Sequence, residues 1–292
     1  MYHKTTGYRI FTWVNNSLLA LLAFVCLLPL IHVLAVSFSG KEAAGANLVN
    51  LWPVDFTTVA YQQTLQNNNF AHAMLVSFTR VLLGTGIGML LCILAAYPLS
   101  KGAEVLRGRT ALSFYFLFTM LFNGGLIPTY ILVSNLHIMN SIWALILPSA
   151  LNVWNIILMM NFFRNVPKEL EEASLIDGAN HLRTLVSVYL PISLPSLATI
   201  ALFTIVYHWN SWFEGLIYIN SQDDYPLATL LQTIIVQPDL SKLNGNVNAL
   251  KEYSQRTVKA AQIFIAALPI LLIYPFLQRF FVKGIVLGAV KS

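Results

Sequence analysis

Residues 164–195 read RNVPKELEEASLIDGANHLRTLVSVYLPISLP and form a polar segment between two long apolar runs. Pro167 suits the first position of a helix, and the glutamates that follow it lie where the helix dipole favours negative charge. Asp177-Gly178 predicts the end of that helix, because glycine readily adopts the left-handed C-cap conformation. We expect a second short helix over about 179–189, ending before the next proline. The segment is therefore predicted to be a helix–turn–helix between two apolar helices.

The composition around this segment is that of a membrane protein. Of 292 residues, 57% are hydrophobic and 10% are charged, whereas an ordinary globular domain carries about 25% charged residues. This excludes a soluble enzyme, a nucleic-acid-binding protein and a disordered chain. Cys26 and Cys92 both lie inside apolar runs, so we expect two small buried hydrophobes, with neither a disulfide framework nor a Cys/His zinc site.

Six runs are long and apolar enough to cross a bilayer, which takes about 20 residues of helix. They are residues 18–36, 74–99, 111–133, 142–163, 196–219 and 260–282. The first follows Lys4 and Arg9 as a signal peptide would, but its length and the five later spans favour a retained anchor. We predict an all-α integral membrane protein with six transmembrane helices and a single membrane domain over 1–292.

The positive charges orient these spans. With the N-terminus inside, the inner segments hold more Lys and Arg than the outer ones, a bias that places both termini in the cytoplasm. The inner set is Lys4, Arg9, Lys101, Arg107, Arg109, Arg164, Lys168, Arg183, Arg279, Lys283 and Lys291, and the outer set is Lys41, Lys242, Lys251, Arg256 and Lys259. The segment 164–195 then lies on the cytoplasmic side.

Two charged residues, Arg80 and Glu214, lie within the predicted spans. Intramembrane ionisable groups usually face the bundle interior or a wet cavity, so both are candidates for a substrate path. Arg80 lies in the outer third of its span, where snorkelling to the outer interface is the simpler interpretation. A cation at that depth would also suit an acidic sugar.

Residues 207–214, YHWNSWFE, lie from the middle to the outer half of the fifth span, the depth at which transporters bind substrate. On a continuous helix His208, Ser211 and Trp212 share one face. Aromatic plates beside amides and hydroxyls suit a sugar, but the same groups also join helices by hydrogen bonds, so both interpretations stay open. The candidate pathway residues are His208, Trp209, Asn210, Ser211, Trp212, Glu214 and Arg80, with Asn152 and Asn155 on the fourth span.

Two further patterns concern the packing of the spans. Gly84-x-Gly86-x-Gly88 favours close approach of a neighbouring helix and is not a phosphate-binding loop. Pro269 and Pro275 predict kinks in the sixth span. Both patterns describe helix geometry rather than chemistry.

The polar segment resembles the EAA loop of ABC-importer permeases. The matching residues are Glu172-Ala173-Ser174, then Gly178, then Val188-x-Leu190-Pro191, with Ser174 and Val188 as conservative departures from Ala and Ile. Asp177-Gly178-Ala179, and the position between spans four and five of six, are similar to carbohydrate permeases. Residues 123–130, 143–148 and 208–212 resemble the branch that imports oligosaccharides of complex or acidic polysaccharides, including the smaller permease subunits of alginate oligosaccharide importers.

This resemblance implies a type I importer fold and a set of partners. In such importers a second permease subunit completes the path, two ATPase subunits dock underneath, and an extracytoplasmic solute-binding protein delivers the substrate. The EAA helix fits a cleft in one ATPase, so the implied coupling residues are Glu171, Glu172, Ala173, Ser174, Asp177, Gly178 and Ala179. The chain lacks GxxxxGK[ST], so ATP and Mg are expected on the ATPases, with no cofactor or metal on this chain. The expected location is the bacterial cytoplasmic (inner) membrane.

Other classes of function fit less well. An ABC permease for amino acids, peptides or phosphate is the nearest alternative, and the 208–212 stretch argues against it. An ion-coupled transporter or channel predicts relays of charge inside the spans, and two isolated charges are a poor relay. A membrane enzyme needs a nucleophile–base pair or a metal cluster, and the sequence offers neither. The segment 282–288, VKGIVLG, resembles the family's C-terminal tail, and a frayed terminus is an equally good interpretation.

Overall fold

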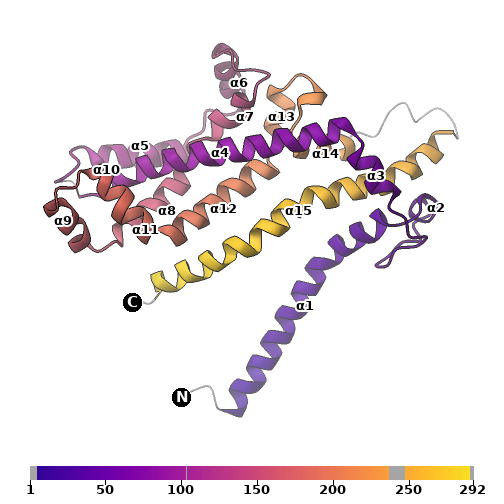
Figure 1. The fold of residues 1–292 in the computed structure, drawn as a ribbon, viewed down its shortest axis with the longest axis horizontal. Helices are drawn as coiled ribbons and strands as arrows, with labels where there is room; N and C mark the ends of the chain where they lie inside the picture. Colours follow the sequence, from indigo (N-terminus) through magenta and orange to yellow (C-terminus); the bar gives the residue numbers. More distant parts are fainter. Residues whose placement is uncertain (1–4, 103, 237–246, 290–292) are drawn as a thin grey trace. The chain divides into compact units, whose positions relative to one another are not determined.

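The structure is a computed structural model that describes residues 5–102, 104–236 and 247–289 (Figure 1). All regular secondary structure in these ranges is helical. The backbone contacts divide the chain into two compact units. One comprises residues 1–71 with 231–268, and the other comprises 72–230 with 269–292. The prediction of a single domain is not tested by this division and stays a prediction.

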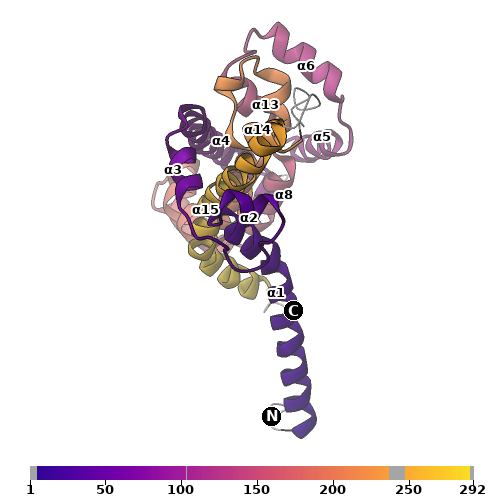
Figure 2. The same ribbon diagram turned by 90° about the vertical axis from the view of Figure 1, so that its right-hand side faces the viewer.

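The first unit contains α1 (Thr6–Ser37), α2 (Lys41–Gly45), α3 (Val59–Leu65) and the beginning of α15 (Val247–Ala289). Ala35 and Val36 at the end of α1 pack against Ala43 and Ala44 of α2, an arrangement visible in Figure 2. The rest of α1 is largely exposed, as expected of a helix whose apolar surface meets lipid or another subunit. Cys26 is exposed on this helix, so the expectation that it is buried was wrong for the chain by itself, whereas Cys92 is buried.

Within the described residues, three helices are long and apolar enough to span a membrane as single helices. They are α1, α4 (Asn68–Ser100) and the part of α15 from Arg256 to Phe276. The corresponding predicted spans are placed correctly, although each observed helix is longer than predicted at one or both ends. Residues 282–288 continue the backbone of α15, and their side chains lie outside the described part of the chain.

The third and fourth predicted spans are broken. Helix α5 (Arg109–Leu121) and α6 (Leu126–Asn135) meet at 111°, and α7 (Ile142–Ile146) with η2 (Leu147–Ser149) meets α8 (Val153–Arg164) at 51°. The first break is encoded by Asn123-Gly124-Gly125. Gly125 has φ +89°, which glycine adopts without the strain that other residues incur. An uninterrupted helix over 111–133 was therefore a wrong prediction.

The fifth predicted span is broken as well. Helix α12 (Leu194–Asn210) ends before Ser211, and α13 (Phe213–Tyr218) starts after Trp212. The shared face expected for His208, Ser211 and Trp212 required one continuous helix, so that expectation was wrong. Tyr218 of α13 packs with Val133 of α6 and Ala144 of α7, and Figure 1 shows these three helices together.

The core of the second unit lies between α4, α8 and α12, which run side by side (Figure 1). Gly84 permits this closeness, because a Cβ there would lie 2.5 Å from Nε2 of His208. A Cβ on Gly88 would lie 3.2 Å from the carbonyl oxygen of Ala150, whereas one on Gly86 would meet nothing within 4 Å. The prediction of close packing is confirmed at Gly84 and Gly88 and was wrong at Gly86.

The polar segment 164–195 folds into four short helical pieces. Helix α9 (Lys168–Ile176) ends where Gly178 takes φ +80°, which confirms the predicted stop. The chain then continues through α10 (His181–Thr184), the π-helical turn η3 (Leu185–Tyr189) and α11 (Leu190–Ile192). Ending the second helix before Pro191 was wrong, because Pro191 stands near the start of α11, where its missing N–H costs little. Short helices η4 (Gln222–Asp224) and α14 (Leu227–Val236) follow α13.

Candidate functional site

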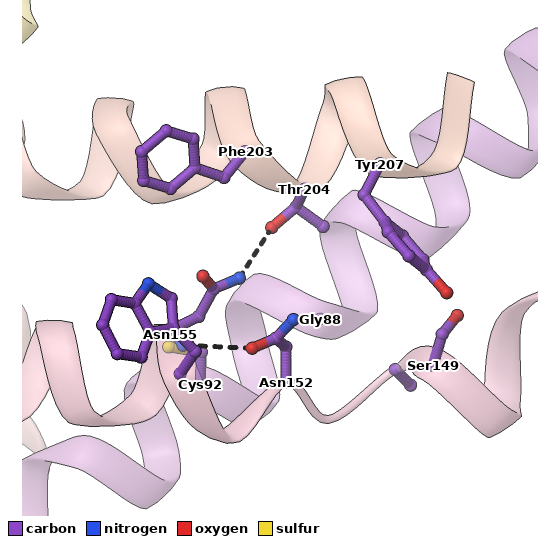
Figure 3. Close-up of a pocket in the computed structure, with 10 residues that line it drawn as sticks. Gly88, Cys92, Ser149, Asn152, Asn155, Phe203, Thr204 and Tyr207 are labelled. Carbon is purple, nitrogen blue, oxygen red and sulfur yellow. Dashed lines mark hydrogen bonds between the residues drawn. The ribbon is translucent and has the colours of Figure 1, made fainter. Parts of the chain in front are cut away.

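A cavity of about 370 Å³ opens between α4, η2, α8 and α12 (Figure 3). The residues that line it are Gly88, Cys92, Ser149, Ala150, Asn152, Trp154, Asn155, Phe203, Thr204 and Tyr207. These residues supply amides, hydroxyls and three aromatic rings, and none is an Asp or Glu. The lining therefore combines neutral hydrogen-bonding groups with apolar surface, the usual mixture in a small-molecule site.

Hydrogen bonds fix the polar side of this cavity. Asn152 caps α8, its side-chain oxygen accepting from the backbone N–H of Asn155 at 3.2 Å. Asn155 Nδ2 donates to Thr204 Oγ1 at 3.3 Å and so joins α8 to α12. Figure 3 shows the Tyr207 hydroxyl facing that of Ser149 across the cavity. Asn152 and Asn155, both predicted pathway residues, are thus placed at the cavity wall.

A buried ion pair lies at the break between α12 and α13. Arg80 of α4 is fully buried, and its Nη1 donates to the carbonyl oxygen of Ser211 at 2.8 Å. Its Nη2 lies 3.5 Å from Oε2 of Glu214. Ser211 Oγ also donates to that carboxylate, and the Tyr207 hydroxyl donates to Oε1 at 3.2 Å. Snorkelling of Arg80 was therefore a wrong interpretation, because the guanidinium points inward to a broken helix end.

The other residues of the 208–212 stretch lie outside the cavity lining. His208 is buried against Gly84, and Trp209 is buried with its ring packed edge-on against Phe78, the centroids 5.2 Å apart. Asn210 is exposed, and Trp212 is 37% exposed. Their role in a substrate path stays a prediction.

A second polar cluster joins the end of α4 to α9. Lys101, the residue after α4, donates from Nζ to Oε1 of Glu171 at 2.6 Å and to the hydroxyl of Tyr189 at 2.7 Å. The Tyr189 hydroxyl in turn donates to Oε2 of Glu171 at 2.6 Å. Burial raises the pKa of the Glu171 carboxyl, but these hydrogen bonds outweigh burial and leave its pKa below the ordinary value. Glu171 is therefore an ionised residue held within this chain.

The remaining predicted coupling residues occupy the outer surface of α9 and the turn after it. Glu172, Ala173, Asp177 and Gly178 are exposed, and Ala179 is half-buried. Ser174 hydrogen-bonds Thr184 of α10 at 3.0 Å. The outer surface of α9 also carries Ile176, whose side chain is 85% exposed. An apolar side chain this exposed on a short helix is typical of a protein-contact surface.

Sequence reasoning missed several of these residues. Thr204 was not singled out, and Tyr207 lay in the 207–214 stretch without being among the candidate residues. Their spacing of three places them on one face of α12. Lys101 was counted as an orienting charge, and nothing in its local sequence indicates a partner seventy residues away. Among the described residues, no three His, Cys, Asp or Glu side chains gather closely enough for a metal ion.

Comparison with known proteins gives a family match over nearly the whole chain. Residues 2–287 match the family described as "Binding-protein-dependent transport system inner membrane component". The polygalacturonan/rhamnogalacturonan transport system permease protein YtcP of Bacillus subtilis is 40% identical over 287 residues, covering 97% of this chain and 99% of that protein. Protein LplC of the same organism is 37% identical over 290 residues, covering 99% and 98%.

Solved structures agree with this match. A chain from the crystal structure of a bacterial ABC transporter that imports the acidic polysaccharide alginate is 33% identical, with a TM-score of 0.84 and coverage of 95% of this chain and 98% of that one. A chain from an alginate ABC transporter in complex with a pentasaccharide-bound periplasmic protein is 14% identical, with a TM-score of 0.58 and coverage of 92% of each chain, which shows the fold alone. The predicted relationship to carbohydrate ABC-importer permeases is confirmed, and the chain is a transport subunit rather than an enzyme.

Proposed function

Since the chain belongs to the family of binding-protein-dependent transport system inner membrane components and is a carbohydrate-importer permease, we propose that it helps to import acidic oligosaccharides. It forms one half of the path, together with a second, different permease subunit. A solute-binding protein delivers the oligosaccharide from outside, and two ATPase subunits supply the energy. The acid is a uronate of the kind found in pectin or alginate.

The observation that carries this proposal is the cavity between α4, α8 and α12. Asn155, Thr204 and Tyr207 present the amide and hydroxyl groups that bind sugar hydroxyls, while Trp154 and Phe203 offer rings for the apolar sugar faces. Among the described residues no carboxylate lines the cavity, and the nearby Glu214 carboxylate, which accepts from Tyr207, is paired with Arg80.

The acidic class is supported by the relatives. One is named for transport of polygalacturonan and rhamnogalacturonan, and a solved neighbour imports alginate. Polygalacturonan and alginate are both built from uronic acids, so these relatives have in common a carboxylated sugar rather than one particular monosaccharide. An importer for amino acids, peptides or phosphate has no such support.

The membrane arrangement follows from the same proposal. Helices α1, α4 and the 256–276 part of α15 each cross the bacterial cytoplasmic membrane once. One more crossing each comes from α5 with α6, from α7 and η2 with α8, and from α12, which meets the preceding helical stretch His181–Ile192 at 84°. The positive charges then place both termini and α9 in the cytoplasm. In this orientation α9 faces an ATPase, and ATP and Mg bind to the partner subunits.

Uptake by the complete transporter, reconstituted in proteoliposomes with its binding protein, tests this function. We expect import of short oligogalacturonates or oligoalginates and none of neutral maltodextrins of equal length. Asn155→Ala is expected to lower uptake about tenfold, the effect of losing one or two buried hydrogen bonds. Asn161→Ala is the matched control, because Asn161 lies on the same helix, is exposed and is outside the cavity lining. Equal uptake of neutral and acidic sugars would remove the acidic preference, and equal loss in both variants would remove the cavity from the path.

A further inference from the structure

Helix α9 is attached to the protein by polar contacts rather than by a buried apolar face. None of its residues is buried, although Leu170, Leu175 and Ile176 are apolar and substantially exposed. The half-buried side chains are Glu171 and Ser174. A nine-residue helix is too short to be stable on its own, so its position depends strongly on what these two side chains bind.

Glu171 makes the stronger of these attachments. Both of its carboxylate oxygens are occupied, Oε1 by Lys101 and Oε2 by Tyr189, each at 2.6 Å. Lys101 follows α4, Glu171 lies in α9 and Tyr189 lies in η3, so a closed triangle of short contacts joins three separate elements. The side chains of Lys101 and Glu171 are only 7% and 17% exposed, which protects the pair from competing water.

Aromatic rings pack around the ammonium group of Lys101. Lys101 Nζ lies 4.2 Å from the ring centre of Tyr97 and 4.0 Å from that of Tyr189. Phe163 packs edge-on against both rings. A lysine ammonium held over two rings and against a carboxylate has one favourable position. The site therefore fixes both the orientation of the Lys101 side chain and its distance from Glu171.

We propose that Lys101 and Glu171 are positioning residues that hold α9 to the end of α4, so that movement of a docked ATPase is passed to the wall of the transport path. Helix α4 runs from this cluster to Gly88 and Cys92, which line the cavity. The inference rests on the proposed function, because it takes α9 as the ATPase contact.

The same geometry gives the neighbouring residues Glu171 and Glu172 different roles. Both oxygens of Glu171 already accept a hydrogen bond within the chain, and its side chain is only 17% exposed, so it is poorly placed to bind a partner subunit. Glu172 is exposed and is left for the ATPase. Glu171, predicted from the resemblance to couple directly, therefore acts through α4 instead.

The test compares single and double variants in the reconstituted transporter. Lys101→Met and Glu171→Gln are each expected to reduce oligosaccharide imported per ATP hydrolysed by about fivefold, within the range that coupling-site mutations produce. The double variant is expected to be no worse than either single one, because the two side chains act as a unit. Tyr189→Phe keeps the ion pair and is expected to have a smaller effect in the same direction. Glu169→Gln, on the exposed surface of the same helix, is the control and is expected to match the unmodified protein.

Amide hydrogen exchange of residues 168–176 in the same preparations gives a readout that needs no substrate. Faster exchange in Lys101→Met than in Glu169→Gln is expected. Additive losses in the double variant, or a normal import-to-ATP ratio with only less assembled complex, would overturn the positioning role. An unmodified complex without stimulated ATP hydrolysis would instead overturn the proposed function, and the exchange measurement would still decide whether the pair holds α9.

Discussion

Two ion pairs, one with Arg80 inside α4 and one with Lys101 directly after its last residue, serve different elements. Residues 80 and 101 are separated by a helical rise of about 30 Å, close to the thickness of the hydrocarbon core. Arg80 is fully buried, yet its carboxylate partner is 3.5 Å away and 25% exposed. Lys101 is slightly more exposed and makes two contacts shorter than 2.8 Å. The more deeply buried cation thus has the longer contact with its carboxylate.

The partners explain the difference. Arg80 binds Ser211 and Glu214, which lie three residues apart on the two sides of one helix break. The cation lies at the C-terminal end of α12 and the carboxylate lies in the first turn of α13, so each matches the dipole of its helix end. Lys101 instead joins elements that the chain folds separately. One pair completes a local structure, and the other connects two structures.

Removal of Arg80 is expected to have the largest effect on stability. Arg80→Met leaves the Ser211 carbonyl and the Glu214 carboxylate without their buried cation, which costs about 3–5 kcal/mol. In both variants the carboxylate keeps neutral donors, Tyr189 for Glu171 and Ser211 with Tyr207 for Glu214. The cost of Lys101→Met is smaller because Lys101 is less buried than Arg80 and its removal takes no donor from a backbone carbonyl. The midpoint of thermal unfolding of the purified protein in detergent measures both. A smaller shift for Arg80→Met than for Lys101→Met would reverse the comparison.

The contact of α4 with α12 gives the next largest effect. Gly84→Ala is expected to destabilise the protein by about 1–3 kcal/mol, because the new Cβ would lie 2.5 Å from His208. Gly86→Ala is the matched control one half-turn away, where a Cβ meets nothing within 4 Å, and it is expected to be neutral or slightly stabilising. The same thermal measurement applies. Equal destabilisation by both substitutions would mean that the contact with His208 does not determine the cost.

The next prediction concerns the proposed docking of an ATPase to the exposed surface of α9, in contrast to the Lys101–Glu171 pair, which lies within the chain. Glu172→Lys is expected to lower substrate-stimulated ATP hydrolysis of the reconstituted complex about tenfold, the effect of one lost charge-assisted contact. The exposed Glu169 provides the control Glu169→Lys with the same charge change. Normal stimulation in the Glu172 variant would remove that residue from the coupling mechanism.

The sequence predicted the elements better than it predicted their interruptions. Hydrophobic runs located α1, α4 and α15, and Asp177-Gly178 located the end of α9, because both signals are local. The breaks at 122–125 and 211–212 lie inside apolar runs, so span length concealed them. The first break can be recognised in the sequence from Asn123-Gly124-Gly125. The second break is stabilised by Arg80 from a distant helix, so its local sequence does not reveal it.

The same contrast between local sequence signals and contacts from distant elements applies to the candidate site. Asn152 and Asn155 stood out as amides in an apolar run, and the cavity lies beside them. The joining of Lys101 to Glu171 depends on how the polar segment folds back onto α4, which no spacing rule predicts. Polar residues could be recognised from sequence, but their partners could not.

The smallest expected effect is the pH dependence of the Lys101–Glu171 pair. Burial raises the pKa of Glu171, but hydrogen bonds from Lys101 and Tyr189, together with the charge of Lys101, leave it below its ordinary value of 4.5. Because the folded-state pKa is the lower one, the carboxylate's contribution is complete above the unfolded pKa and is lost as the pH falls through the folded value. Protection of the α9 amides, corrected for intrinsic exchange, is therefore expected to stay constant from about pH 8 to about pH 5 and to fall only below that range. Glu171→Gln is expected to abolish this step, and Glu169→Gln to retain it. Protection that already falls between neutral pH and the lower limit of this range would require a raised pKa, and the pair would then hold α9 less firmly than its short contacts indicate.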